Sequence, residues 1–332
     1  MKKVLHISHH IGCFRDQQYI LNKLGLHVDN HKFTDNVFRI TKEIADDFWN
    51  KNEELFNSYD YILISDTAPL SRPFLQNIEK LNPKLIIWIC NRFDYAMSGD
   101  IEYYELFHNA TNNPKITIVA STLFEKLWCL QHGSNIMFNP VINPLGKHDL
   151  DFNIPRANVF NEMYGESKEL LDADVFVPFY HNDNQFFKMA NYLRLNDLSV
   201  CNGTFYSPSQ LNKYSAFVTL PDTFCKWFSF EAIHNNIPVL LPSVELLMKL
   251  SKQGNYLFNI TGYGGAEMLT EDLAKLSEWY NPKLEKCRYY FNSIEEIPNI
   301  IKALKNCDKH DFTKYSTMIE SETLDKWKLI YK

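Results

Sequence analysis

The stretch from residue 225 to residue 243 combines three side chains that suit an anion-binding helix start. Ser229 can cap a helix there, because its hydroxyl accepts a backbone N–H, and the N–H groups and dipole of a helix start favour negative charge. Lys226 precedes this start and could neutralise a diphosphate. Glu231 would lie in the first turn. Because a carboxylate repels a diphosphate, its more sensible partner is a pair of sugar hydroxyls.

The same stretch predicts a helix, a tight turn and a buried strand. Phe230, Ile233 and His234 recur at i, i+3 and i+4, which gives the helix one packing face. Asn235 and Asn236 can take the positive φ that ends a helix, and Pro238 stops it. Residues 239–241 are continuous and apolar, as in a strand that is covered on both faces.

The run Phe230-Glu-Ala-Ile-x-Asn-x-Ile-Pro-Val-Leu-Leu-Pro242 resembles the donor-site segment of the GT-B fold glycosyltransferase superfamily (Leloir type). In that superfamily a Glu in such a run holds the ribose of a nucleotide sugar, and Glu231 matches its position. Asn236 replaces the usual Gly, which is tolerable because Asn visits the left-handed region readily. Retaining members of one large family carry a second Glu where this chain has Thr223, so the stereochemical outcome stays open.

The resemblance implies an α/β fold of two Rossmann-like parallel-sheet domains that face each other across a cleft. It also implies that the loop after the first strand of the second half faces the donor, which makes His181 a catalytic candidate. A turn at Gly203 would let the backbone approach the nucleotide. The donor-binding residues expected on this basis are Tyr180, Gly203, Lys226, Ser229, Phe230 and Glu231.

Three loops of the first half follow predicted strands, and ligands of parallel sheets bind beyond the carboxyl ends of the strands. A base there would lower the barrier by taking the proton of an acceptor hydroxyl, and His, Asp and Glu are the usual agents. His9, His10, Asp66 and Asp94 all lie in these loops, with His10 and Asp94 the leading candidates. Such a base is needed only if the enzyme inverts configuration. Arg92 could be a surface residue, a partner for Asp94, or a contact for phosphate or acceptor.

Strands and helices alternate in both halves, which predicts mainly parallel sheets covered on both faces. Residues 138–146 contain two prolines and a glycine and read as a linker. We expect domains over 1–140 and 147–310, and by resemblance a terminal helix over 311–332 that returns to the first domain. The predicted strands include 4–7, 59–65, 84–90, 115–119, 174–180, 200–203, 216–220, 256–260 and 288–291, and the predicted helices include 15–24, 41–56, 70–81, 121–131, 186–195, 271–279 and 293–305.

Composition sets the class of protein. A length of 332 residues allows two domains, and 45% hydrophobic with 22% charged residues is typical of a soluble globular chain. The net charge of −6 argues against nucleic acid as a partner. We find no signal peptide and no apolar run near 18 residues, which favours a cytoplasmic protein without a transmembrane segment and leaves peripheral membrane contact open. Seven scattered cysteines without a CxxC pair indicate reduced thiols.

No metal or resident cofactor is expected. The DxD formed by Asp172 and Asp174 precedes a predicted strand, whereas a metal-binding DxD follows one. No GxGxxG follows the first strand, which argues against NAD. The sequence therefore predicts a metal-independent glycosyltransferase that moves a sugar from a nucleotide-diphosphate sugar to a glycan or other hydroxyl acceptor. The alternative is a non-catalytic two-domain protein that binds a glycan or a partner, and a nucleotide-sugar epimerase is a lesser option.

Overall fold

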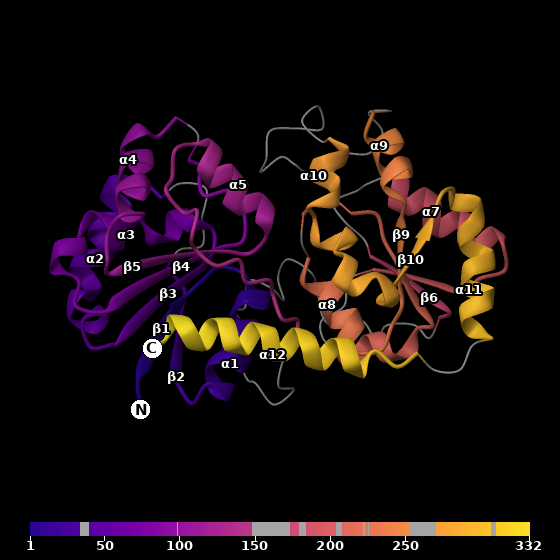
Figure 1. Ribbon diagram of the computed structural model, residues 1–332, viewed down its shortest axis with the longest axis horizontal. Coiled ribbons are helices and arrows are strands. Elements are labelled where there is room, and N and C mark those ends of the chain that lie inside the picture. Colours follow the sequence, from indigo (N-terminus) through magenta and orange to yellow (C-terminus); the bar gives the residue numbers. More distant parts are fainter. Residues whose placement is uncertain are drawn as a thin grey trace. The chain divides into compact units, whose positions relative to one another are not determined.

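The computed structural model describes ten segments of the chain: 1–33, 40–97, 99–147, 173–178, 184–203, 208–221, 223–224, 226–252, 270–306 and 310–332. The chain forms two compact units (Figure 1). The first comprises Met1–Asp149 and Glu320–Lys332, and the second comprises Leu150–Ile319. Each unit is built around its own sheet.

The first unit contains a five-stranded sheet in the order β2-β1-β3-β4-β5, with every described pair parallel. Its strands are short apolar runs whose interiors are buried, as the continuous hydrophobic patterning predicts. The order reverses between β1 and β3, and such a switch point opens a crevice beyond the strand ends. The strands are β1 (Lys3–Ile7), β2 (His27–His31), β3 (Tyr61–Asp66), β4 (Lys84–Ile89) and β5 (Ile116–Ala120).

Helices of the first unit cover both faces of this sheet. Because crossovers between parallel strands are right-handed, the strand order puts α1 on one face and the helices between β2 and β4 on the other. Trp49 of α2 contacts Phe74 of α3 at 6.2 Å between ring centroids, and Arg72 of α3 pairs with Asp100 at the start of α4 at 2.5 Å. The helices are α1 (Ile11–Lys23), α2 (Lys42–Phe56), α3 (Arg72–Gln76), α4 (Ile101–Ala110) and α5 (Leu123–Gln131).

Three local predictions in this unit were wrong. The helix expected over 70–81 is three short turns, Ala68–Ser71, Arg72–Gln76 and Ile78–Lys80, and the first two begin at prolines. The helix expected over 121–131 begins later, at Leu123, and Thr122 caps it by accepting from the Phe124 N–H. Helix α4 was not predicted, although Asp100 caps it by accepting from the Tyr103 N–H at 2.9 Å.

The carboxyl end of the last helix, α12 (Thr313–Ile330), belongs to the core of the first unit. Trp327 packs edge-on against Trp88 of β4 with ring centroids 5.7 Å apart, and both indoles are fully buried. The Tyr61 hydroxyl donates to the backbone carbonyl of Tyr331 at 3.0 Å. These contacts fix the end of α12 on the sheet.

The second unit repeats the same topology. Its five strands are all parallel and lie in the order β10-β9-β8-β6-β7, which is the order of the first sheet when both are numbered along the chain. Its switch point lies between β6 and β8. The prediction of two Rossmann-like parallel-sheet domains is therefore confirmed. The strands are β6 (Val175–Pro178), β7 (Val200–Gly203), β8 (Ala216–Val218), β9 (Val239–Pro242) and β10 (Arg288–Phe291).

An aromatic core holds the helices of the second unit on its sheet. Phe228 of α8 stacks on Phe217 of β8 at 4.6 Å and contacts Trp279 at 5.2 Å between ring centroids. The helix predicted over 271–279 ends early and continues as a 3-10 turn, and the predicted strand over 256–260 lies outside the described residues. The helices are α7 (Asn184–Leu195), α8 (Trp227–His234), α9 (Val244–Lys252), α10 (Glu271–Lys275) and α11 (Ile297–Lys305).

Candidate functional site

Helix α8 begins beyond the carboxyl end of β8, beside the switch point of the second sheet. Lys226 occupies the N-cap position with an extended backbone and makes no side-chain capping bond. Ser229 lies inside the helix, where its hydroxyl donates to the Lys226 carbonyl at 3.0 Å. The prediction that Ser229 caps the helix was wrong, because Phe228 must join the core and the helix therefore starts at Trp227.

Glu231 is a buried carboxylate in the second turn of α8, one turn later than predicted. It lies five residues past the N-cap, which places it on the order of 7 Å along the axis from the helix start. Its residue is 7% exposed, and its neighbours Phe230 and Ala232 are 2% and 0% exposed. The sequence therefore brings one acid close to a helix start in an environment with little water.

The turn after α8 has the predicted form. Asn236 takes a φ of 58°, in the left-handed region where the sequence placed it. Its side-chain oxygen accepts from the Phe312 N–H at 2.7 Å, just before α12 begins. His234 Nδ1 lies 2.5 Å from the Ser316 hydroxyl of α12. Helix α8 is thus held at its far end, so its N-terminus is positioned by the core and by this turn.

Gly203 ends β7 and pairs with Pro178 at the end of β6, next to the switch point. Among the described residues, no atom beyond the chain neighbours of Gly203 lies within 4 Å of the position that a Cβ would take there, so these residues leave the backbone open. Tyr180 and His181 follow β6 in sequence and lie outside the described residues. Their predicted contacts with the donor stay predictions.

At the carboxyl edge of the first sheet, two histidines have structural partners. The exposed His10 caps α1, because its Nδ1 accepts from the Gly12 N–H at 3.1 Å. His6 is fully buried, with Nε2 2.7 Å from the Ser65 hydroxyl, and burial lowers its pKa to about 3. His6 is therefore neutral at physiological pH.

Asp94 is buried among three donors. The Trp128 indole donates to its Oδ1 at 3.1 Å, and the Tyr104 hydroxyl donates to its Oδ2 at 2.5 Å. Arg92 Nε lies 3.0 Å from Oδ1 and forms an ion pair with it, not a hydrogen bond, and the guanidinium carbon lies 4.8 Å from the centre of the Trp128 ring. The Arg92–Asp94 pair, one of the alternatives for Arg92, is therefore present. These contacts occupy much of the accepting capacity of the carboxylate.

Asp66 has a different backbone conformation and fewer partners than Asp94. It ends β3 with a φ of 76°, a conformation that is uncommon for residues other than glycine. Burial raises the pKa of its carboxyl to about 7. Among the described residues, its carboxylate receives one long hydrogen bond, from the Asn91 amide at 3.4 Å. The sequence placed Asp66 among the candidates but gave no sign of its backbone strain or its raised pKa.

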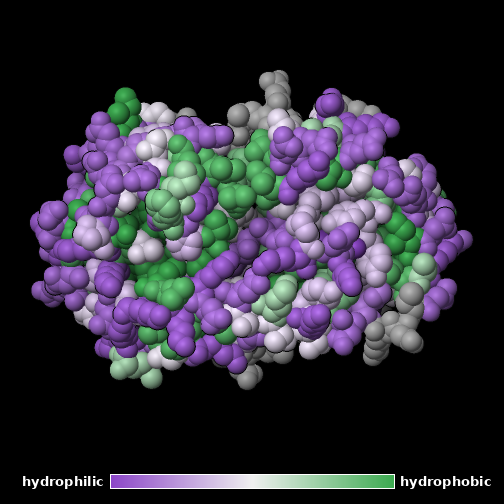
Figure 2. Space-filling model, in the orientation of Figure 1, coloured by the Kyte–Doolittle hydropathy of each residue, from purple (hydrophilic) through white to green (hydrophobic). Residues whose placement is uncertain are grey.

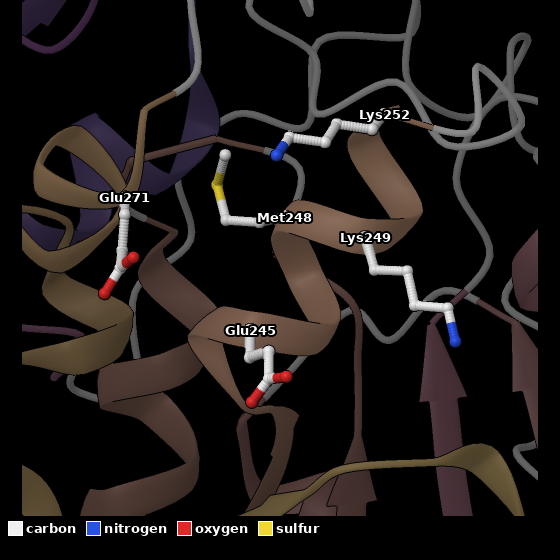
Figure 3. A pocket seen from close by; sticks show the side chains of 5 residues that line it. All are labelled: Glu245, Met248, Lys249, Lys252 and Glu271. Atoms are coloured by element: carbon white, nitrogen blue, oxygen red, sulfur yellow. The ribbon is translucent and has the colours of Figure 1, made fainter.

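A separate pocket lies on the second unit between α9 and α10 (Figure 3). It has a volume of about 600 Å³ and charged walls, and none of its lining residues belongs to the predicted site. Four of them lie along α9 and one on α10: Glu245, Met248, Lys249, Lys252 and Glu271. Across the segments that the structure describes, no cluster of three or more potential metal ligands is found.

The surface also bears on membrane contact. None of the described helices combines the length and the apolar character that a membrane span requires. Figure 2 shows a mixed surface in which hydrophobic areas interrupt hydrophilic ones. Large apolar side chains exposed on the first unit include Phe138 at 97% and Ile101 at 74%. Peripheral membrane contact stays a prediction.

No family model and no curated protein matches the sequence. Three similar solved structures are HepE of Anabaena in complex with UDP, a UDP-glucosyltransferase of Polygonum tinctorium and MnaA of S. aureus with UDP. HepE is 11% identical with a TM-score of 0.49, and the match covers 98% of this chain and 96% of HepE. The plant enzyme is 10% identical with a TM-score of 0.45, covering 98% of both chains. MnaA is 14% identical with a TM-score of 0.40, covering 92% of this chain and 97% of MnaA. The fold assignment itself rests on the two strand orders.

Proposed function

We propose that this protein is a glycosyltransferase that moves a sugar from a nucleotide-diphosphate sugar to a glycan or other hydroxyl acceptor without a metal ion. The observation that carries the proposal is the placement of α8. Its N-terminus lies beside the switch point of a parallel sheet, with Lys226 at the N-cap and the buried Glu231 one turn further on. In this proposal the helix start binds the anionic part of the ligand, and the Glu231 carboxylate accepts hydrogen bonds from its hydroxyls. Both lie close enough for one nucleotide to contact them together.

The helix start suits the diphosphate. The first N–H groups of a helix have no partner within the helix, and its dipole adds roughly half a positive charge. Lys226 adds a full charge at the same point. As the bond between the sugar carbon and the phosphate oxygen breaks, the electron pair stays on the leaving diphosphate. Positive charge fixed at that oxygen stabilises the transition state more than the ground state. In this proposal the helix start and Lys226 supply the charge that a metal ion would otherwise bring.

Glu231 suits the ribose. A carboxylate can accept from both hydroxyls of a vicinal diol, and charge-assisted hydrogen bonds of this kind are short and strong. At 7% exposure Glu231 meets little competing water, which makes the bonds stronger still. Gly203, across the switch point on β7, leaves open surface where a nucleotide could approach the backbone. We propose Phe230 and Ser229 only as supports, because Phe230 is in the core and the Ser229 hydroxyl bonds within the helix.

The experiment that tests the function is a thermal-shift screen with UDP, GDP and dTDP and with their sugars, followed by measurement of free nucleoside diphosphate. Stabilisation by one nucleotide together with slow release of the diphosphate is the expected result. Stabilisation by an oligosaccharide alone would point to a binding protein. Conversion of the nucleotide sugar to an isomer without any acceptor would point to an epimerase. Either of these outcomes would overturn the proposal.

A further inference from the structure

We propose that the turn at Met137 and Phe138 docks on an anionic lipid surface, into which these two side chains insert. The proposal is carried by the exposure of both side chains, the anchoring of the turn and the positive charge at its base. It concerns the first unit alone, to which all of these residues belong. It does not depend on the proposed function.

The apolar turn, residues 136–139, exposes its two central side chains. The Asn139 N–H donates to the Ile136 carbonyl at 3.1 Å, which closes a β-turn with Met137 and Phe138 at its centre. Central positions of turns usually hold Gly, Pro, Asn, Asp or Ser. Here they hold two large apolar side chains, and Phe138 is 97% and Met137 56% exposed. Their packing contributes little to this fold, which points to a partner outside the chain.

The two ends of the apolar turn are fixed to the edge strand β5. Asn139 Nδ2 donates to the Ile118 carbonyl at 2.8 Å. The Ala120 N–H donates to the Pro140 carbonyl at 3.2 Å, and the Ile136 side chain is fully buried. The turn therefore holds its apolar side chains in place, so their insertion into a partner would require little further ordering. These bonds also satisfy backbone groups that lipid could not satisfy.

Two lysines place positive charge at the base of the apolar turn. Lys126 Nζ of α5 donates to the Asn139 carbonyl at 2.7 Å. Lys326 Nζ of α12 donates to the Val141 carbonyl at 3.0 Å. Neither ammonium forms an ion pair with a described carboxylate, and residues 126–148 contain no Asp or Glu, although the chain has a net charge of −6. An apolar tip above uncompensated positive charge suits an anionic lipid surface.

Helix α5 extends this surface beyond the turn. Leu123 is 40% exposed and lies three residues before Lys126, so both side chains are on the same side of the helix. Hydrophobic side chains gather over α5 in Figure 2, which has the orientation of Figure 1. A lysine can bury its apolar stem while its ammonium stays among polar headgroups. The exposed side of α5 is therefore compatible with the same lipid surface as the turn.

A second copy of the chain is the other occupant that an apolar turn of this kind could have. In a symmetric dimer through the turn, the same surface patch of each copy would meet. The lysines at the base of both turns would then come together, and like charges at an interface are unfavourable. Anionic lipid carries the opposite charge. The charge pattern therefore favours lipid over a second copy.

The first test is sedimentation of the 332-residue chain with vesicles of phosphatidylcholine alone and with vesicles of phosphatidylcholine and phosphatidylglycerol in equal amounts. We expect binding to the mixed vesicles and much weaker binding to the neutral ones. Phe138→Ser should lower the partition coefficient for mixed vesicles about 10- to 100-fold, which is roughly what full burial of such a side chain is worth. Leu195→Ser is the matched control, because Leu195 is 84% exposed but lies on the second unit. It should bind as wild type does.

The contribution of charge is measured with lysine variants in the same assay. Lys126→Gln and Lys326→Gln should each lower the partition coefficient by about 5-fold, and added salt should reduce the difference. Lys249→Gln, on α9 of the second unit, should have no effect. The melting temperature of Phe138→Ser should equal that of wild type, because the replaced ring is almost entirely in water. Loss of binding in that variant then reports on the surface and not on folding.

Insertion itself is measured with Phe138→Trp. The fluorescence that this variant adds to that of wild type should be quenched by mixed vesicles whose lipids carry brominated acyl chains. Mixed vesicles with ordinary acyl chains should not quench it. This readout distinguishes insertion into the bilayer from attraction to its headgroups.

Several outcomes would overturn the proposal. It is wrong if wild-type protein sediments with neither kind of vesicle, or if Phe138→Ser sediments as wild type does. Equal binding to both kinds of vesicle would exclude an anionic partner, and absence of quenching in bound Phe138→Trp would exclude insertion. If light scattering shows a dimer without lipid that Phe138→Ser abolishes, the turn serves a second copy instead. None of these results bears on the release of nucleoside diphosphate that tests the proposed function.

Discussion

The two sheets share one strand order, but their carboxyl edges carry opposite chemistry. The first edge presents Asp66, a strained and partly buried acid among uncharged groups. The second edge presents the start of α8 with Lys226, a site of positive potential. One topology therefore carries an acid with a raised pKa in one unit and a helix start with a lysine at its N-cap in the other. The difference lies in the loops after the strands, whose residues are not dictated by the packing of the sheet.

The largest expected effect tests whether the two acids of the first edge have different roles. Asp94→Ala leaves the partly buried Arg92 without its partner, along with two donors, and should lower the free energy of unfolding by about 3–5 kcal/mol. Chemical denaturation measures this directly. Asp66→Asn should show no such loss. An unchanged free energy of unfolding would show that the contacts of Asp94 with Arg92, Trp128 and Tyr104 do not stabilise this edge.

The next largest effect is expected for Glu231 at the second edge. Glu231→Gln removes the charge that we assign to the ribose and should weaken nucleotide binding by about 1.5–3 kcal/mol, while binding of inorganic pyrophosphate, which has no ribose, stays the same. Calorimetric titration with each ligand provides the comparison. If the binding of the nucleotide and of pyrophosphate weakened equally, Glu231 would act through the helix start and not through the ribose. A large fall in melting temperature with unaltered binding would make it structural.

A third prediction concerns pH and the first edge. The folded pKa of Asp66 is raised to about 7, above the usual value of about 3.9 in an unfolded chain. The native state therefore holds a proton that the unfolded chain has released, and stability from this group is present below about pH 4 and lost as pH rises through about 7. Residue 66 cannot titrate in the Asp66→Asn variant. The melting temperature of the variant minus that of the wild type should therefore increase as the pH is raised from about 5 to 8. A difference that is constant with pH would show that Asp66 titrates normally.

A smaller effect is expected at the helix start itself. Lys226→Gln should weaken the binding of both UDP and pyrophosphate by about 0.3–1 kcal/mol, since Lys226 acts as one partly exposed charge. The loss should shrink as salt is added, because exposed charges are screened. Lys249→Gln, on α9, is a suitable control that should change neither affinity. A loss that does not depend on salt would argue against an electrostatic role.

The sequence was a good guide to the parts set by hydrophobic patterning and local chemistry. The apolar runs of β3, β4 and β9 predicted buried parallel strands, and the turn at Asn236 was predicted from its tolerance of positive φ. The Arg92–Asp94 pair was one of the alternatives that the sequence left open for Arg92. Each of these depends on residues that are neighbours in sequence or on a simple period.

The sequence was a poor guide where tertiary packing decides. Ser229 reads as a cap, but the core position of Phe228 pulls the helix start back to Trp227. The raised pKa of Asp66 comes from burial beside Cys13 and Cys90, which are far apart in sequence. Its positive φ depends on the β3–β4 register. These features arise only when separate segments meet.

The central claim is that the start of α8 binds a nucleoside diphosphate, and hydrogen exchange measured by mass spectrometry tests it most directly. With saturating UDP, GDP or dTDP, whichever stabilises the protein, amides of residues 226–231 should exchange more slowly than in the unliganded protein. In Glu231→Gln at equal nucleotide concentration this protection should diminish. A nucleotide that binds tightly and protects other segments while leaving residues 226–231 unchanged would contradict the account.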